Sequence, residues 1–221
     1  MLFADSATGG PLPAAYATMP CVALVHEQRS VEIRSGAQAS SADPRHYVVA
    51  DTLKDGTAIT IRAIRRDDSG RVLEAFTNLD PESIYTRFFS PKRGLTDLEL
   101  KQFTDVDFDR VVALVVTTRT EGSQTLIAGG RYVSDDAQPS VRSAEVAFTT
   151  EEDYRGRGIA SLILGHLVRI ARQMGVSRFE AYVLTGNQSM LSVFRRSGLP
   201  MQLRYEGGIV HVTLSLAPES S

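Results

Sequence analysis

Short stretches of alternating hydrophobic and polar residues recur along the chain, and this alternation is typical of strands that bury one face. The predicted strands are residues 58–64, 111–118, 125–133, 143–150, 178–184 and 209–216. The first follows an Asp-Gly turn at 55–56, and the last closes a hairpin at 207–208. Short polar connections join the second, third and fourth strands, so we expect these three to form an antiparallel meander.

Other stretches repeat their apolar residues at helical spacing and carry capping residues at their ends. The predicted helices are residues 68–78, 82–89, 97–104, 155–175 and 187–197. The third begins with the capping box Thr96-x-x-Glu99, and the fourth ends at Gly175. Because strands and helices do not alternate regularly, their order predicts an α+β fold with a mixed, mostly antiparallel central sheet flanked by helices.

The first 45 residues differ in composition from the rest of the chain. They are rich in Ala, Ser, Gly and Pro, apart from an apolar run at 21–33. We interpret residues 1–45 as a partly disordered N-terminal extension, with a short strand or docking arm at 21–33 as the alternative. Residues 46–221 are expected to form one domain, which suits a chain of 221 residues that is 43% hydrophobic.

Charge, cysteine content and hydropathy exclude several classes of protein. A net charge of -2 gives no overall attraction to nucleic acid or to an anionic membrane. The single cysteine, Cys21, excludes an internal disulfide and favours a reducing cytoplasm. No apolar run is long enough to span a membrane, and the N-terminus lacks the pattern of a signal peptide. No metal site is predicted, because neither His166 nor His211 has a second ligand at a suitable spacing.

The residues before the longest predicted helix are suited to binding an anion. Its apolar run is preceded by two arginines and two glycines, namely Arg155, Gly156, Arg157 and Gly158. A helix N-terminus presents backbone N–H groups without partners, and glycine lets a ligand approach them closely. The turn is not a Walker A loop, which needs Gly-Lys followed by Ser or Thr. It also departs from the dinucleotide-binding turn, since Ser161 replaces the third glycine.

A carboxylate in the fourth predicted strand is a candidate for catalysis. Glu145 lies within the sequence SAEVAF, where an unpaired buried charge is costly or has a raised pKa. Transfer of an acyl group to an amine needs a base, because an amine with a pKa near 10.4 is mostly protonated. Glu145 can serve as that base, directly or through a water. The alternative is a solvent-facing carboxylate, or one paired with Arg131 or Arg142.

The pattern Arg155-x-x-Gly158-x-Ala160 resembles the Gln/Arg-x-x-Gly-x-Gly/Ala signature of the GNAT superfamily of N-acetyltransferases. In that superfamily the turn binds the pyrophosphate of coenzyme A, in agreement with the anion-binding chemistry of a helix N-terminus. Further segments match in order between residues 53 and 216, including AEVAFTTEEDYRGRGIASLIL and VLTGNQSML. Together they resemble the acetyltransferase domain of the bacterial Pat-type protein lysine acetyltransferases. The resemblance implies the GNAT fold.

The resemblance also implies roles for particular residues. Glu145 is expected to be the general base, and the backbone of residues 148–150 to bind the acetyl and pantetheine groups. Asn187 is expected beside the cofactor's arm. Arg196 has two interpretations, a contact with a phosphate or a position on a solvated helix face. The expected cofactor-binding residues are Phe148, Thr149, Thr150, Arg155, Gly156, Arg157, Gly158, Ile159, Ala160, Asn187 and Arg196.

The implied function is the acetyl-CoA-dependent acetylation of a lysine Nε on a protein, with an AMP-forming acyl-CoA synthetase as the implied partner. One departure from the superfamily is Phe194, which stands where many members have a tyrosine that protonates the leaving thiolate. The departure is tolerable because a thiol with a pKa of about 8.5 leaves readily as the thiolate. Two alternatives stay open: a small-molecule amine N-acetyltransferase and a non-catalytic acyl-CoA-binding regulator.

Overall fold

The computed structural model describes residues 43–88, 92–120, 122–135 and 142–217. Within these residues eight strands form one sheet in the order β1-β2-β3-β4-β5-β6-β8-β7. Neighbouring strands are antiparallel except β5 and β6, which are parallel, so the predicted mixed, mostly antiparallel sheet is confirmed. The strands are β1 (Val48–Thr52), β2 (Ala58–Ala63), β3 (Val111–Thr120), β4 (Ser123–Asp135), β5 (Ser143–Thr150), β6 (Arg178–Leu184), β7 (Met201–Glu206) and β8 (Ile209–Ser215).

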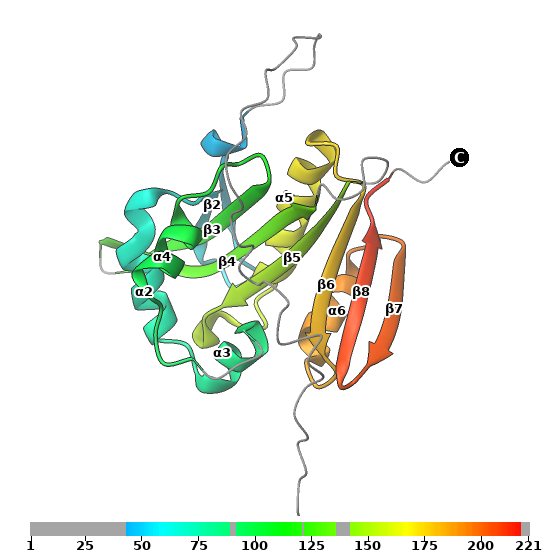
Figure 1. Cartoon of the computed structure of the whole chain (residues 1–221). Coiled ribbons are helices and arrows are strands. Elements are labelled where there is room, and N and C mark those ends of the chain that lie inside the picture. Colours follow the sequence, from blue (N-terminus) through cyan, green and yellow to red (C-terminus); the bar gives the residue numbers. More distant parts are fainter. Residues whose placement is uncertain (1–42, 89–91, 121, 136–141, 218–221) are drawn as a thin grey trace, which may run out of the picture.

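Helices cover both faces of the sheet (Figure 1). α2, α3 and α4 lie over one face of β3, β4 and β5, and α5 and α6 lie on the opposite face. In the part of the chain that the structure describes, no helix is long and apolar enough to cross a membrane. The helices are α2 (Ser69–Thr77), α3 (Pro81–Phe88), α4 (Asp97–Thr104), α5 (Ile159–Gln173) and α6 (Gln188–Arg196), with 3-10 turns η1 (Pro44–His46), η2 (Arg66–Asp68) and η3 (Glu152–Tyr154).

The alternating pattern of the central strands explains where α5 packs. On β5, Ala144 and Val146 are buried while the residues between them are only partly buried. On this face of the sheet a β-carbon at Gly130 of β4 would lie 2.5 Å from Cγ2 of Ile163 on α5, and 3.0 Å from the ring of Phe148. The helix therefore approaches the sheet more closely than a side chain at position 130 would allow.

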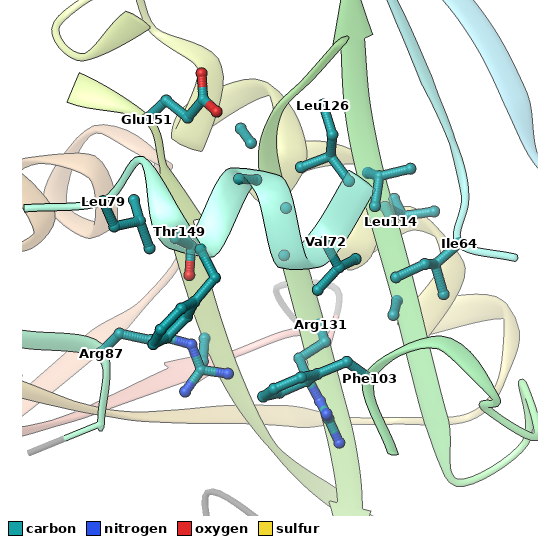
Figure 2. A pocket seen from close by; sticks show the side chains of 18 of the residues that line it. Ile64, Val72, Leu79, Arg87, Phe103, Leu114, Leu126, Arg131, Thr149 and Glu151 are labelled. Atoms are coloured by element: carbon teal, nitrogen blue, oxygen red, sulfur yellow. The ribbon is translucent and has the colours of Figure 1, made fainter. Parts of the chain in front are cut away.

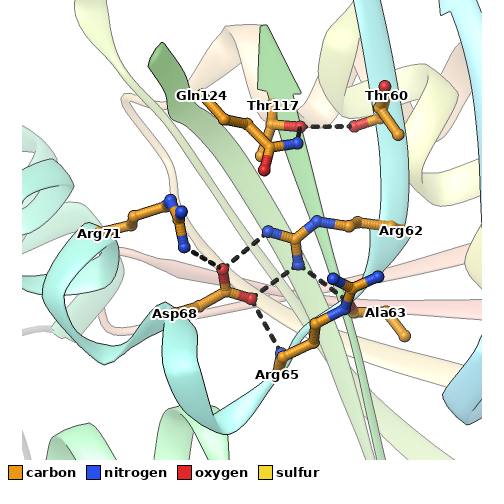
Figure 3. A network of polar contacts seen from close by, with 8 residues as sticks. All are labelled: Thr60, Arg62, Ala63, Arg65, Asp68, Arg71, Thr117 and Gln124. Carbon is orange, nitrogen blue, oxygen red and sulfur yellow. Dashed lines mark hydrogen bonds and ion pairs between the residues drawn. The ribbon is translucent and has the colours of Figure 1, made fainter.

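A buried ion pair joins β2 to the start of α2 (Figure 3). Both oxygens of the Asp68 carboxylate accept hydrogen bonds from the Arg62 guanidinium at 2.7 Å, and Oδ2 also accepts from the Arg65 backbone N–H at 2.9 Å. Arg62 is 4% exposed and Asp68 is 0% exposed, so each charge depends on the other for stabilisation. Burial alone raises the pKa of Asp68, but the hydrogen bonds from Arg62 and Arg65 outweigh this effect and lower it.

The structure corrects the expected start of the longest helix. α5 begins at Ile159 rather than at residue 155, because Gly156 and Gly158 have φ values of 72° and 86°, which a right-handed helix does not contain. The strand β1 was not predicted, and it pairs with β2 across the expected Asp-Gly turn. Residues 1–42, with the apolar run at 21–33, and residue 89 of the second predicted helix lie outside the described residues.

Candidate active site

The two parallel strands at the centre of the sheet separate soon after they begin to pair. β5 and β6, both fully described, pair through three rungs, and the last rung joins Glu145 to Glu180. Beyond it, residues 146–150 and residues 181–184 diverge (Figure 1). We term the opening between these two segments the strand gap. β6 keeps its pairing with β8 along its whole length, so the gap exposes the edge of β5 to a ligand.

Hydrogen-bond directions determine which backbone groups face the strand gap. The Glu151 N–H donates to the carbonyl of Ile127 in β4 at 3.0 Å. On the other side of β5, the Arg142 carbonyl accepts from the Ser177 N–H at 2.9 Å. Backbone groups of successive residues alternate between the two sides of a strand, so the even-numbered residues of β5 face β6. The backbone groups that face the gap are those of Val146, Phe148 and Thr150.

Because of this alternation, the backbone groups of the three residues expected to bind the acetyl and pantetheine groups, 148–150, do not all face the same side of β5. Phe148 and Thr150 present their backbone to the strand gap, whereas the Thr149 backbone faces β4 and its side chain lines a cavity on the other face of the sheet (Figure 2). The Phe148 ring packs edge-on against Phe194 of α6, with 6.1 Å between ring centroids. Phe194 is 1% exposed, so the position of the superfamily's tyrosine is a core position here and carries no hydroxyl.

The N-terminus of α5 is suited to an anion. Its N-cap is Gly158, which has no side chain to accept hydrogen bonds from the first N–H groups of the helix. The turn from Arg155 to Gly158 is exposed except at Arg157, which is partly buried. The aligned peptide dipoles place partial positive charge at this end of the helix. The Arg155 N–H already donates to the Glu152 carbonyl, so the N–H groups of residues 156–160 are those that can bind a phosphate.

Both arginines of the turn are held by carboxylates. Arg155 Nη2 lies 2.8 Å from Asp80 Oδ2, and Arg157 Nη1 lies 2.7 Å from Asp55 Oδ2. The Arg157 guanidinium also lies over the ring of Tyr154, 4.9 Å from its centroid. The sequence indicated two cations for a pyrophosphate, and in the structure a pyrophosphate has to compete with two carboxylates for them. The backbone N–H groups of residues 156–158 do not face this competition with carboxylates, whereas that of Arg155 donates to the Glu152 carbonyl.

Two other expected cofactor contacts lie at the ends of α6. Asn187 follows β6 closely and is the N-cap of α6, where its side-chain oxygen accepts a hydrogen bond from the Met190 N–H at 3.0 Å. This capping role was not predicted, although Asn is a preferred N-cap residue. Arg196 lies in the last turn of α6 and is exposed, which fits both of its interpretations.

Glu145 lies at the closed end of the strand gap, in the last rung that joins β5 to β6. Its side chain is partly buried, so the fully solvent-facing interpretation is wrong. Burial raises the pKa of Glu145 and the charge of Glu180 raises it further, whereas Arg87 and Arg131 act to lower it. The Arg142 guanidinium donates to main-chain carbonyls of other segments. A carboxylate with a raised pKa is a stronger proton acceptor than an exposed one.

A largely apolar cavity of about 130 Å³ lies between α2, α3 and α4 and the face of the sheet opposite α5 (Figure 2). Its polar lining comes from four side chains, those of Arg87, Arg131, Thr149 and Glu151. Two of these side chains, Arg87 and Arg131, also lower the pKa of Glu145, although Glu145 itself is not among the lining residues. The sequence did not predict the cavity, which depends on how three short helices pack on the sheet.

A polar cluster on β6 and β8 also escaped the sequence analysis. Glu180 lies 3.0 Å from Arg178 Nε and 3.2 Å from His211 Nε2. The His211 ring is stacked on the Tyr182 ring, with 4.8 Å between centroids. Alternation identifies these residues as polar positions of strands, but the rung that pairs Glu180 with Glu145 depends on a register that local sequence does not specify. Among the described residues, no three or more His, Cys, Asp or Glu side chains are grouped so that they could hold a metal ion.

Comparison with known proteins identifies the family. The model of the acetyltransferase (GNAT) domain matches residues 58–200. Acetyltransferase Pat of Mycolicibacterium smegmatis is 32% identical over 166 residues, which are 75% of this chain and 48% of that protein. The chain therefore spans about half the length of this relative. Acetyltransferase PA5475 of Pseudomonas aeruginosa is 26% identical over 159 residues, which are 71% of this chain and 81% of that protein.

A solved structure agrees with the sequence matches. The GNAT domain of S. lividans PAT superimposes with a TM-score of 0.69 at 32% identity, covering 80% of this chain and 99% of that chain. The region matched by the family model contains the strand gap, Glu145 and the N-terminus of α5. Since this model covers more than half of the sequence, the chain belongs to the GNAT acetyltransferase family.

Proposed function

We propose that this protein is an acetyl-CoA-dependent lysine Nε-acetyltransferase that acts on a protein in the cytoplasm. The observation that carries the proposal is the position of Glu145, a partly buried carboxylate with a raised pKa in the last rung before the strand gap. A base at this point can reach an amine that approaches a thioester held in the gap. Donor and acceptor would be bound together, because direct transfer needs both within reach of the same base.

The donor site is formed mainly by backbone groups. The edge of β5 at Phe148 and Thr150 offers N–H and C=O groups to the pantetheine arm and the thioester. The turn from Arg155 to Ala160 holds the pyrophosphate through the N–H groups at the start of α5. Asn187 lies near the open end of the gap, where its amide nitrogen can contact the arm while its oxygen caps α6. Acetyl-CoA supplies the thioester carbon that the acceptor attacks.

The residues of this site account for each proton and bond in the transfer. Glu145 takes one proton from the lysine ammonium, which frees the lone pair of the amine for attack on the thioester carbon. Backbone N–H groups that face the gap stabilise the negative oxygen of the tetrahedral intermediate. The carbon–sulfur bond then breaks and the electron pair leaves on sulfur, while the second proton of the nitrogen passes to the departing thiolate or to solvent water. The thiolate needs no side-chain acid, because its pKa of about 8.5 makes it a good leaving group.

A protein acceptor is favoured over a small amine by the surroundings of Glu145. Arg87 and Arg131 line the largely apolar cavity and act on the charge of Glu145, and these two cations repel a polycation such as a polyamine. The similarity to Pat acetyltransferases supports a lysine on a protein, and we propose an AMP-forming acyl-CoA synthetase as that protein. A non-catalytic acyl-CoA-binding regulator would not need a base, so the raised pKa of Glu145 argues against it.

The test is to incubate the protein with labelled acetyl-CoA and either an acyl-CoA synthetase or free polyamines. Wild type, Glu145→Gln and the control Glu206→Gln are compared, since Glu206 is an exposed carboxylate at the end of β7. We expect label on the synthetase with wild type and with the control, and very little with Glu145→Gln. Label on polyamines alone would indicate a small-molecule acetyltransferase, and label on neither acceptor would favour the binding module.

A further inference from the structure

Glu145 has a second carboxylate directly beside it. Glu180 of β6 is its partner in the last rung of the parallel pair. Partners in a sheet project to the same face, and neighbouring strands are about 4.8 Å apart. The two side chains therefore project side by side from the face opposite α5, at the point where β5 and β6 separate, and the charge of Glu180 acts on Glu145. The proposed mechanism uses only one of them.

The Glu180 carboxylate has a hydrogen bond with His211 and an ion pair with Arg178, whose Nε lies close to it without the direction of a hydrogen bond. Arg178 Nε lies 3.0 Å from Oε1, and His211 Nε2 lies 3.2 Å from Oε2. The His211 ring is itself fixed by stacking on Tyr182, with the two planes 13° apart. The Glu180 side chain is 25% exposed, so these contacts leave part of the carboxylate open to a ligand. Such support from a second layer of residues is typical of a binding group held in one geometry.

We propose that Glu180 binds the ammonium group of the acceptor lysine and orients it toward Glu145. This inference rests on the proposed acetyltransferase function and adds a residue to its acceptor site. A lysine ammonium has three N–H donors, so it can donate to Glu145 and to Glu180 at the same time. When Glu145 takes one proton, the amine keeps its hydrogen bond to Glu180, which holds the freed lone pair in a fixed direction. Glu180 itself gains and loses no proton in this step.

The charges around Glu145 agree with this assignment. Two cations act on it from the side of the cavity, Arg87 of α3 and Arg131 of β4, and both lower its pKa. Glu180 is the neighbouring group that raises the pKa of Glu145 by its charge, after the larger effect of burial. A cationic acceptor that enters beside the two arginines is repelled by them and needs a negative charge to offset this repulsion. Glu180 of β6 provides that charge. Two further groups contact Glu180, His211 from β8 and Arg178 from β6 itself.

The proposal is tested with Glu180→Gln, which keeps the shape of the side chain and removes its charge. We expect the KM for the acceptor to rise about tenfold or more, because the lysine ammonium loses a charged hydrogen-bond acceptor. The KM for acetyl-CoA should be unchanged. The acidic limb of the pH profile of kcat/KM should move to lower pH, since the pKa of Glu145 falls when the neighbouring negative charge is removed. His211→Gln should raise the acceptor KM by a smaller factor, because it removes only part of the support for Glu180.

The control is again Glu206→Gln, with unfolding temperatures measured for every variant. An unchanged acceptor KM together with an unmoved acidic limb in Glu180→Gln would overturn the proposal. A lowered unfolding temperature with equal losses toward donor and acceptor would also overturn it, by making Glu180 a structural residue. These outcomes require a wild type that transfers acetyl groups. A wild type that labels no lysine at all would refute the proposed function itself, and the role of Glu180 with it.

Discussion

Replacement of Glu145 by glutamine should make the transfer depend on the small neutral fraction of the acceptor amine. A lysine with a pKa of about 10.4 is neutral in only about 0.4% of molecules at pH 8. Without a base the enzyme must wait for this fraction, so kcat/KM at pH 8 should fall roughly 250-fold, within the range of about 100- to 10,000-fold that general bases supply. The partly buried position of Glu145 keeps bulk water from replacing it easily as the base.

The pH dependence separates this explanation from a structural defect. Wild-type activity should fall only when pH drops through the pKa of Glu145, and burial places this fall at a higher pH than for an exposed glutamate. Activity of Glu145→Gln should instead rise about tenfold per pH unit until the amine itself is neutral near pH 10. The assay is the initial rate of labelled acetyl transfer between pH 6 and pH 10, with unfolding temperatures as the folding control. Parallel profiles for the two proteins would refute the reasoning.

Three further predictions concern the scaffold and the donor site. Gly130→Ala should lower the free energy of unfolding by about 1–3 kcal/mol, measured in urea, because the new β-carbon meets Ile163; an unchanged stability would contradict the close packing of α5. Asp68→Ala should lower the free energy of unfolding by about 3–5 kcal/mol at pH 7, because it leaves the buried Arg62 without its partner. The folded-state pKa of Asp68 lies below the unfolded value of about 3.9, so the difference between the variant and wild type should shrink as pH falls below that value and through the folded-state pKa. Asp80→Asn should tighten the binding of coenzyme A severalfold in calorimetry, because it releases an arginine of the turn before α5; weaker binding would mean that Asp80 holds this turn in its binding shape.

The elements that sequence predicted well are those whose pattern is set locally. Alternation located β5 and β6 to the residue, because each strand has alternate residues buried in the core. The capping box at Thr96 and Glu99 is formed as expected, because its hydrogen bonds involve neighbours in the chain. The glycines at 156 and 158 were identified as part of an anion-binding turn, although their positive φ values move the start of the helix to Ile159.

The features that sequence did not predict depend on contacts between distant segments. The rung between Glu145 and Glu180, and with it the place where the strand gap opens, follows from the register of two strands whose paired residues lie 35 positions apart in the sequence. The pairing of Arg155 with Asp80 joins the donor site to the segment before α3. No local pattern carries this information. The cavity beneath α2 likewise depends on tertiary packing and left no periodic signal.

The central claim is that backbone groups at the start of α5 hold the diphosphate of the donor while its sulfur lies in the strand gap beside Glu145. A crystal structure of the protein with coenzyme A bound tests this claim directly. We expect the diphosphate on the N–H groups of residues 156–160, and the sulfur between β5 and β6 on the side of the Glu145 carboxylate. A diphosphate bound elsewhere, or a Glu145 carboxylate turned away from the sulfur, would contradict the account.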